Sequence, residues 1–187
     1  SGDELLVFTI NEDDEDNGAD AFPQNPLQWS DFDGDGLGDN WGNSTWLDRP
    51  ESWPGEYIES VKQNEQDACP FQFGTSNQQG IYGCPDLDGD GWYDAIDDFI
   101  QESSQWQDSD GDGFGDNLEG FNGDYCPDIA GTSSQDRKGC LDTDGDGYSN
   151  IDEFWTKYSG GDVYPQDPLQ WADSVSYTHL RAHETGP

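Results

Sequence analysis

Basic residues are scarce in this chain of 187 residues, which has 42 Asp and Glu but only 6 Lys and Arg. The formal net charge at pH 7 is −36. Phosphate binding depends on clusters of Lys and Arg, so this composition excludes a nucleic-acid partner. So large a charge of one sign would also drive the chain apart by self-repulsion unless cations neutralise it.

Apolar residues are scarce as well, at 30% of the chain, against roughly 45–50% in ordinary globular domains. The chain therefore cannot build a large hydrophobic core, and metal coordination and disulfides must replace much of the missing burial. The sequence contains no apolar run of about twenty residues, which argues against direct membrane insertion.

Histidine occurs only at His179 and His183, within the stretch VSYTHLRAHET at residues 175–185. This stretch resembles a translated sequencing adapter, as in a metagenomic fragment, so we expect residues 175–187 to be non-native and the natural sequence to run to about Ser174. Without other histidines, a His-dependent triad is unsupported. Carboxylates are so frequent that their pairing says little about acid–base catalysis. We expect no enzyme activity and no catalytic residue.

One phrase occurs four times: DFDGDGLGD at residues 31–39 (loop 1), DLDGDGWYD at 86–94 (loop 2), DSDGDGFGD at 108–116 (loop 3) and DTDGDGYSN at 142–150 (loop 4). Alternating carboxylates at positions 1, 3 and 5 converge on a hard cation, the Gly at position 6 permits the sharp turn, and the backbone carbonyl at position 7 completes the cage. Each loop is therefore predicted to bind Ca²⁺.

The expected ligands follow from this numbering. Positions 1, 3, 5, 7 and 9 are Asp31, Asp33, Asp35, Leu37 and Asp39 in loop 1; Asp86, Asp88, Asp90, Trp92 and Asp94 in loop 2; Asp108, Asp110, Asp112, Phe114 and Asp116 in loop 3; and Asp142, Asp144, Asp146, Tyr148 and Asn150 in loop 4. Position 12, where an EF-hand places a bidentate carboxylate, is Gly42, Asp97, Glu119 and Glu153, respectively. Loop 1 must therefore borrow a closing ligand, use water, or bind weakly.

The N-terminal residues have two interpretations. Glu12, Asp14, Asp16 and Asp20 have the spacing of a degenerate fifth loop, although a solvated acidic linker explains them as well. Residues 5–10 (LLVFTI) are rich in β-forming residues and could form a strand that ends a preceding segment. We expect at least four ions, and more than four because four Ca²⁺ would leave most of the charge in place.

The four cysteines lie in two similar phrases, and the simplest pairing is local: Cys69 with Cys84 and Cys126 with Cys140. Such disulfides imply an oxidising, extracytoplasmic setting. The alternative, a zinc ion held by all four thiolates, requires close CxxC spacing that is missing from this chain.

A phrase with an aromatic residue and a later Trp also recurs, at residues 20–31, 97–108 and 162–173. Its Trp29, Trp106 and Trp171 are expected to bury themselves in local mini-cores beside the loops. These repeats predict a quasi-linear array, in which residues 57–66 could form two helical turns. The expected segments are 1–11, 12–40 with the first calcium repeat, an insert at 41–68, the stapled repeats 69–125 and 126–161, a truncated repeat at 162–174, and the tail.

The phrases DGDGLGDN, DAFPQNPLQW and CPDIAGTSSQDRKGC resemble the thrombospondin type 3 repeat family in its prokaryotic, secreted or cell-surface form. The resemblance covers roughly residues 12–174. It implies an irregular, calcium-stabilised array that serves as an extracellular spacer or adhesion module, with surface proteins or glycans as partners. Loop 4 and the following NIDEFWTKY also resemble half of a dockerin, which would make residues 151–158 a short helix. A dockerin-like docking module and an accessory region of a secreted hydrolase are the alternatives.

Overall fold

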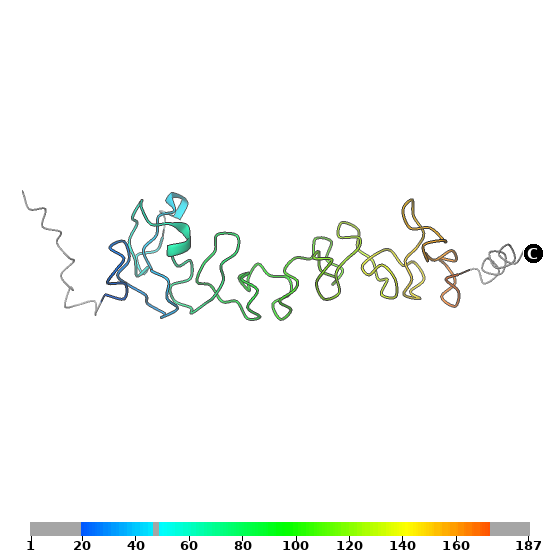
Figure 1. Cartoon of the computed structure of the whole chain (residues 1–187), viewed down its shortest axis with the longest axis horizontal. Coiled ribbons are helices and arrows are strands. Elements are labelled where there is room, and N and C mark those ends of the chain that lie inside the picture. Colours follow the sequence, from blue (N-terminus) through cyan, green and yellow to red (C-terminus); the bar gives the residue numbers. More distant parts are fainter. Residues whose placement is uncertain (1–19, 47–48, 173–187) are drawn as a thin grey trace, which may run out of the picture. The chain divides into compact units, whose positions relative to one another are not determined.

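The computed structural model describes residues 20–46 and 49–172 (Figure 1). Within these ranges the only regular elements are two 3-10 helices, η1 (Ser44–Trp46) and η2 (Gln63–Glu65), with no α-helix or strand. Isolated parallel bridges pair Gly38 with Gln66, Trp41 with Tyr57, Gly115 with Gly123 and Asn150 with Asp162. The predicted irregular fold is confirmed. Residues 5–10, Glu12, Asp14 and Asp16, the last two residues of the expected repeat at 162–174, and the tail at 175–187 lie outside the described residues.

Hydrogen bonds from the backbone to side chains stabilise this fold, where other proteins use helices and sheets. Asp and Asn side chains accept hydrogen bonds from backbone amides two to five residues away, and such local bonds compete with regular secondary structure. Asp31, for example, accepts from the amides of Gly34 and Gly36 at 2.7 and 3.0 Å. None of the described helices is long and apolar enough to cross a membrane.

The chain divides into two compact units, Ser1–Tyr93 and Asp94–Pro187. Each unit contains one disulfide, and the pairing agrees with the prediction: Cys69 with Cys84, and Cys126 with Cys140, at Cα separations of 5.0 and 5.1 Å. All four cysteines are paired, so a zinc–thiolate site is excluded.

The interior is polar. Among the described residues the buried hydrophobic side chains are Trp41, Val61, Cys84 and Cys140, whereas the largest fully buried side chains are Gln28, Gln66 and Gln105. This confirms that the described part of the chain has no large hydrophobic core.

The predicted Trp mini-cores are wrong in detail, because the residue before the Trp takes the buried position. Gln28 and Gln105 are 2% and 1% exposed, whereas Trp29 and Trp106 are half-buried. The Gln105 amide donates to the carbonyls of Asn117 and Phe121 at 2.8 and 2.9 Å, and Gln28 makes the same kind of bridge. An amide satisfies converging backbone carbonyls as an indole cannot. Trp171 is 43% exposed and stacks on Tyr148 at 4.6 Å.

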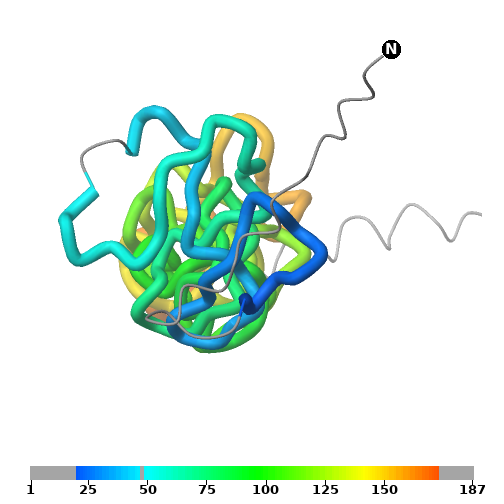
Figure 2. Tube along the Cα trace, turned by 90° about the vertical axis from the view of Figure 1, so that its left-hand side faces the viewer, coloured from blue at the N-terminus to red at the C-terminus, as the bar shows by residue number. Residues whose placement is uncertain are grey.

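The insert at residues 41–68 packs against loop 1 as a small aromatic cluster. Trp41 contacts Trp53 and Tyr57 edge-on or tilted, with ring centroids 6.0 and 6.5 Å apart, and Arg49 lies 3.4 Å from the Trp53 ring centroid. Figure 2 shows the insert, in cyan, as an excursion to one side of the blue segment that carries loop 1.

The helical turns expected at residues 57–66 are confined to η2 (Gln63–Glu65). Both ends of this stretch pair as bridges, Tyr57 with Trp41 and Gln66 with Gly38, which requires extended backbone there.

The helix expected after loop 4 is also wrong. Residues 151–158 form bends and turns because the Asp152 carboxylate accepts from the amides of Phe154 and Trp155, both at 2.7 Å. Arg137 pairs with Asp152 at 2.7 Å and holds it outside a helical arrangement.

Candidate metal sites

All four loops have the same backbone geometry. The glycines at positions 4 and 6 have positive φ, between 79° and 98°, a conformation that other residues adopt at an energetic cost. This conformation directs both glycine amides at the carboxylate of the first Asp, at 2.7 to 3.1 Å in every loop. These two bonds fix the orientation of the first Asp carboxylate within each folded loop.

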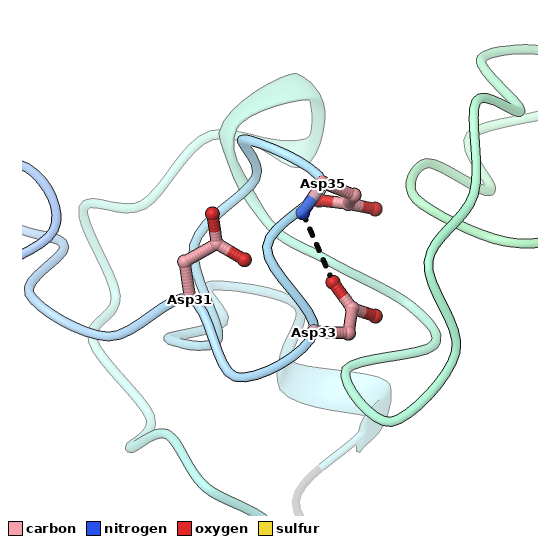
Figure 3. Close-up of side chains that lie close together, drawn as sticks. All are labelled: Asp31, Asp33 and Asp35. Atoms are coloured by element: carbon pink, nitrogen blue, oxygen red, sulfur yellow. Dashed lines mark hydrogen bonds between the residues drawn. The ribbon is translucent and has the colours of Figure 1, made fainter.

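The three alternating carboxylates converge in each loop. The groups are Asp31, Asp33 and Asp35; Asp86, Asp88 and Asp90; Asp108, Asp110 and Asp112; and Asp142, Asp144 and Asp146. Within each group, one oxygen of every carboxylate lies within 4.8 Å of the others. Figure 3 shows the loop 1 group, with the Asp35 amide donating to Asp33 at 3.2 Å. Oxygens that are each about 2.4 Å from one ion lie at most about 4.8 Å apart, so the groups fit Ca²⁺.

Buried carboxylate oxygens without a hydrogen-bond donor support a cation at these groups. They are the Oδ2 atoms of Asp33, Asp88, Asp90, Asp110, Asp144 and Asp146. A buried carboxylate oxygen without a donor or a cation is strongly unfavourable. The ligands are all oxygens, which suits a hard divalent ion such as Ca²⁺ better than zinc or copper.

Positions 7 and 9 support the loops through hydrogen bonds. The amides of Leu37, Trp92, Phe114 and Tyr148 donate to the fifth-position Asp at 2.8 to 2.9 Å. Ligation by their carbonyls stays a prediction. Asp116 accepts from both the amide and the hydroxyl of Ser109, at 3.0 and 2.6 Å. Asn150 accepts from the Thr143 amide at 3.3 Å and donates from Nδ2 to the Thr143 hydroxyl at 2.6 Å. Asp39 accepts from the Ser30 hydroxyl, and its other oxygen is buried without a donor. Asp94 is half-buried.

The twelfth-position residues differ in exposure. Glu119 and Glu153 are exposed and belong to none of the four groups, whereas Asp97 is 8% exposed. At Gly42 a side chain would clash with the carbonyl of Val61. The ligand roles of Asp97, Glu119 and Glu153 stay predictions. Asp20, expected at the end of a fifth loop, is exposed and accepts from the Phe22 amide at 2.7 Å.

Three further aspartates, which sequence reasoning missed, lie buried beside loops 1, 3 and 4. Asp67, Asp124 and Asp162 are 0%, 2% and 0% exposed, and the Oδ2 atom of each is buried without a donor. We call them the closing aspartates. The amide of each donates to the carbonyl at position 8 of its loop: Asp67 to Gly38, Asp124 to Gly115, and Asp162 to Ser149, at 2.8, 2.7 and 2.9 Å.

The pKa shifts of the closing aspartates show that each one lies close to the carboxylates of its loop. Burial, followed by the charges of Asp35, Asp33 and Asp39, raises the pKa of Asp67 to about 8, although the Cys69 amide opposes this. Burial likewise raises the pKa of Asp124 to about 6, with Asp112, Asp110 and Asp116 adding to the effect. Burial raises the pKa of Asp162, and the loop 4 carboxylates add to it. A cation would relieve this repulsion, as expected of shared ligands.

A sequence signal for these residues does exist. Asp20, Asp67, Asp97, Asp124 and Asp162 share the pattern Asp-x-Cys or Asp-x-aromatic, and each accepts from the amide two residues later at 2.6 to 2.7 Å. The same pattern also occurs at Asp39 and within loops 2, 3 and 4, so it is not specific to closing aspartates. The number of residues between each loop and its closing aspartate varies, so counting twelve residues from the first Asp of the loop does not find the closing aspartate.

A scan of the chain against models of protein families finds no match, and a search of curated proteins also finds none. The role of the loops therefore has to be inferred from their own residues and geometry.

Proposed function

We propose that this chain is a calcium-binding structural spacer or adhesion module of a larger extracellular or cell-surface protein, of the thrombospondin type 3 kind. Its role is structural and not enzymatic. The observation that carries the proposal is the fourfold repetition of converging carboxylates whose buried oxygens have no donor. These groups occur in a chain with a net charge of −36, which makes cation binding a condition for compact structure.

Calcium fits better than magnesium. Magnesium demands near-ideal octahedral geometry and keeps several of its waters, whereas calcium accepts six to eight oxygens in flexible cages. A polar side chain at position 9 follows every triad, and closing aspartates lie beside loops 1, 3 and 4 at varying distances along the chain, which suits the more tolerant ion. Disulfides and the lack of a membrane-spanning helix among the described residues are compatible with secretion.

The loop-helix geometry that a dockerin requires does not occur within residues 20–46 and 49–172, where η1 (Ser44–Trp46) and η2 (Gln63–Glu65) are the only helices. No observation favours that alternative over a spacer.

The test compares the whole chain in chelator, in millimolar calcium and in millimolar magnesium, by circular dichroism and small-angle scattering. We expect a large contraction with calcium, a smaller one with magnesium, and affinities of about 10⁻⁴–10⁻³ M. The matched control replaces the third-position aspartates by Asn at Asp33, Asp88, Asp110 and Asp144, which preserves side-chain size. The control should stay expanded in calcium. A chelated chain as compact as the loaded one would contradict the proposal.

A further inference from the structure

Two segments of this fold, each closed by a disulfide, run from one loop to the next. Module 1 is residues 67–84 and module 2 is residues 124–140. Each begins at a closing aspartate and ends at the second cysteine of its disulfide, two residues before the first Asp of the following loop.

The first half of each module holds the loop before it. In module 1 the Asp67 amide donates to the Gly38 carbonyl at 2.8 Å, and the Gly74 amide donates to Asp35 Oδ2 at 3.4 Å. Module 2 repeats both bonds, from Asp124 to Gly115 at 2.7 Å and from Gly131 to Asp112 Oδ2 at 2.8 Å.

The second half of each module holds the loop after it. The amides of Asn77 and Gln78 donate to the Gly91 carbonyl at 2.8 and 3.0 Å, and the Thr75 hydroxyl donates to Asp86 Oδ2 at 3.2 Å. In module 2 the amides of Ser134 and Gln135 donate to the Gly147 carbonyl at 2.8 and 2.9 Å. Gly91 and Gly147 occupy position 6 of loops 2 and 4, where the turn bends most sharply.

The connection between the two halves is short and tightly packed. In module 1 only residues 75 and 76 separate Gly74, which bonds loop 1, from Asn77, which bonds loop 2. A side chain at Gly74 would clash with the Cys84 backbone, and the Cys84 amide donates to the Ser76 hydroxyl at 2.9 Å. The disulfide joins Cys84 back to Cys69, whose amide donates to Asp67 at 2.7 Å. A displacement of one loop is therefore transmitted to the other through only a few tightly packed residues.

We propose that each disulfide module couples cation binding at the two loops it joins, so that the loops fill as two pairs, 1 with 2 and 3 with 4. The inference rests on the proposed calcium function. An ion at loop 1 neutralises Asp35 and Asp67 and fixes the module, so loop 2 then needs less ordering to bind. Residues 95–107, between loops 2 and 3, contain no cysteine, and these loops belong largely to different units.

The experiment is a calcium titration of the full chain followed by NMR. The reporters are the amides of Gly36, Gly91, Gly113 and Gly147, which occupy the same position in their loops and donate to the first Asp at 2.8 to 3.1 Å. Loop 1 is emptied with Asp31→Ala, because the Asp31 carboxylate bonds to Gly34 and Gly36 of its own loop. The control, Glu59→Ala, removes an exposed charge from the same unit.

Asp31→Ala should weaken calcium binding at Gly91 about tenfold, within the usual range of allosteric coupling. Binding at Gly113 and Gly147 should change less than about twofold, because repeat arrays couple neighbours. In the Cys69→Ser, Cys84→Ser background, adding Asp31→Ala should no longer shift binding at Gly91. Asp108→Ala should act on Gly147 in the same way, and this test remains informative if loss of loop 1 unfolds the first unit.

An unchanged loop 2 in the Asp31→Ala chain would overturn the pairing, as would equal weakening of all loops, or coupling that survives loss of the disulfide. If calcium shifts none of the four glycine amides in the unaltered chain, the proposed function itself fails. The two failures are therefore distinguishable.

Discussion

Replacing Asp124 by Asn should have opposite effects on the cation-free and calcium-loaded forms of the second unit. The new carboxamide would keep an oxygen for the Cys126 amide, which donates to Asp124 at 2.6 Å, so the local turn should survive. The change removes one buried negative charge and one anionic oxygen that faces loop 3. Glu119→Gln makes the same charge change at the exposed twelfth-position residue of that loop.

The magnitude follows from the pKa of Asp124, which burial, and then the loop 3 carboxylates, raise to about 6. The usual value is near 3.9, and each unit corresponds to 1.36 kcal/mol, so ionised Asp124 destabilises the cation-free fold by up to about 3 kcal/mol above pH 6. Asp124→Asn should restore stability of that order. In calcium, the variant should bind at loop 3 at least about tenfold more weakly, since even second-shell changes cost roughly 10–100-fold at other metal sites.

The assay combines thermal unfolding in chelator, with an osmolyte that favours the compact form, and a calcium titration of the Gly113 amide. Asp124→Asn should raise the midpoint in chelator and also raise the calcium concentration needed to fill loop 3. Glu119→Gln should leave the midpoint in chelator unchanged, and its effect on the filling of loop 3 tests the ligand role predicted for Glu119. If Glu119→Gln weakens loop 3 and Asp124→Asn does not, Glu119 closes the loop. A lower unfolding midpoint for Asp124→Asn in chelator would contradict this reasoning, because it would show that the Asp124 charge is already compensated in the cation-free fold.

In the osmolyte that favours the compact cation-free form, loop 1 should depend on pH more than loop 3. Burial in that form raises the pKa of Asp67 to about 8, so below pH 8 protons bind Asp67 and compete with calcium. From pH 6.5 to 8.5 calcium binding at Gly36 should strengthen about twentyfold, and at Gly113 less than about twofold; equal changes at both would contradict this. Gln105→Ala should destabilise the loaded second unit by about 2–4 kcal/mol in thermal unfolding, because its amide bridges two carbonyls, whereas Gln107→Ala, at an exposed position, should change little. Native mass spectrometry at saturating calcium should count more than four ions, and four or fewer would contradict the charge argument.

The sequence predicted correctly the features that depend on residues close together in the chain. The alternation of Asp and Gly is enough to specify each loop, because both the ligands and the turn lie within nine residues. The disulfides were predictable for the same reason, since each closes a separation of only 15 or 14 residues. The expected helices at residues 57–66 and 151–158 failed because partners distant in sequence hold those segments. Asp152, which pairs with Arg137 fifteen residues away, is one example.

The closing aspartates show why the remaining part of each site was missed. Asp67 follows loop 1 after a 27-residue connection that includes the aromatic insert, whereas Asp124 follows loop 3 after only seven residues. The connection varies because only its two ends are constrained, by the bond from the closing Asp to position 8 and by the turn that follows. A rule that counts twelve residues from the start of the loop therefore finds none of the three closing aspartates.

In this chain the groups that would bind cations are also the groups that would otherwise oppose folding. Asp39, Asp67 and Asp162 are fully buried, yet each has an oxygen without a donor, and few apolar side chains are buried beside them. Apolar burial is therefore too small to offset the repulsion among these carboxylates. Under the proposed function, the free energy of ion binding becomes the free energy of folding, as in other small metal-stabilised domains. The polar interior fits this arrangement, because a buried Gln or Asn can hold the backbone around a loop without adding to its charge.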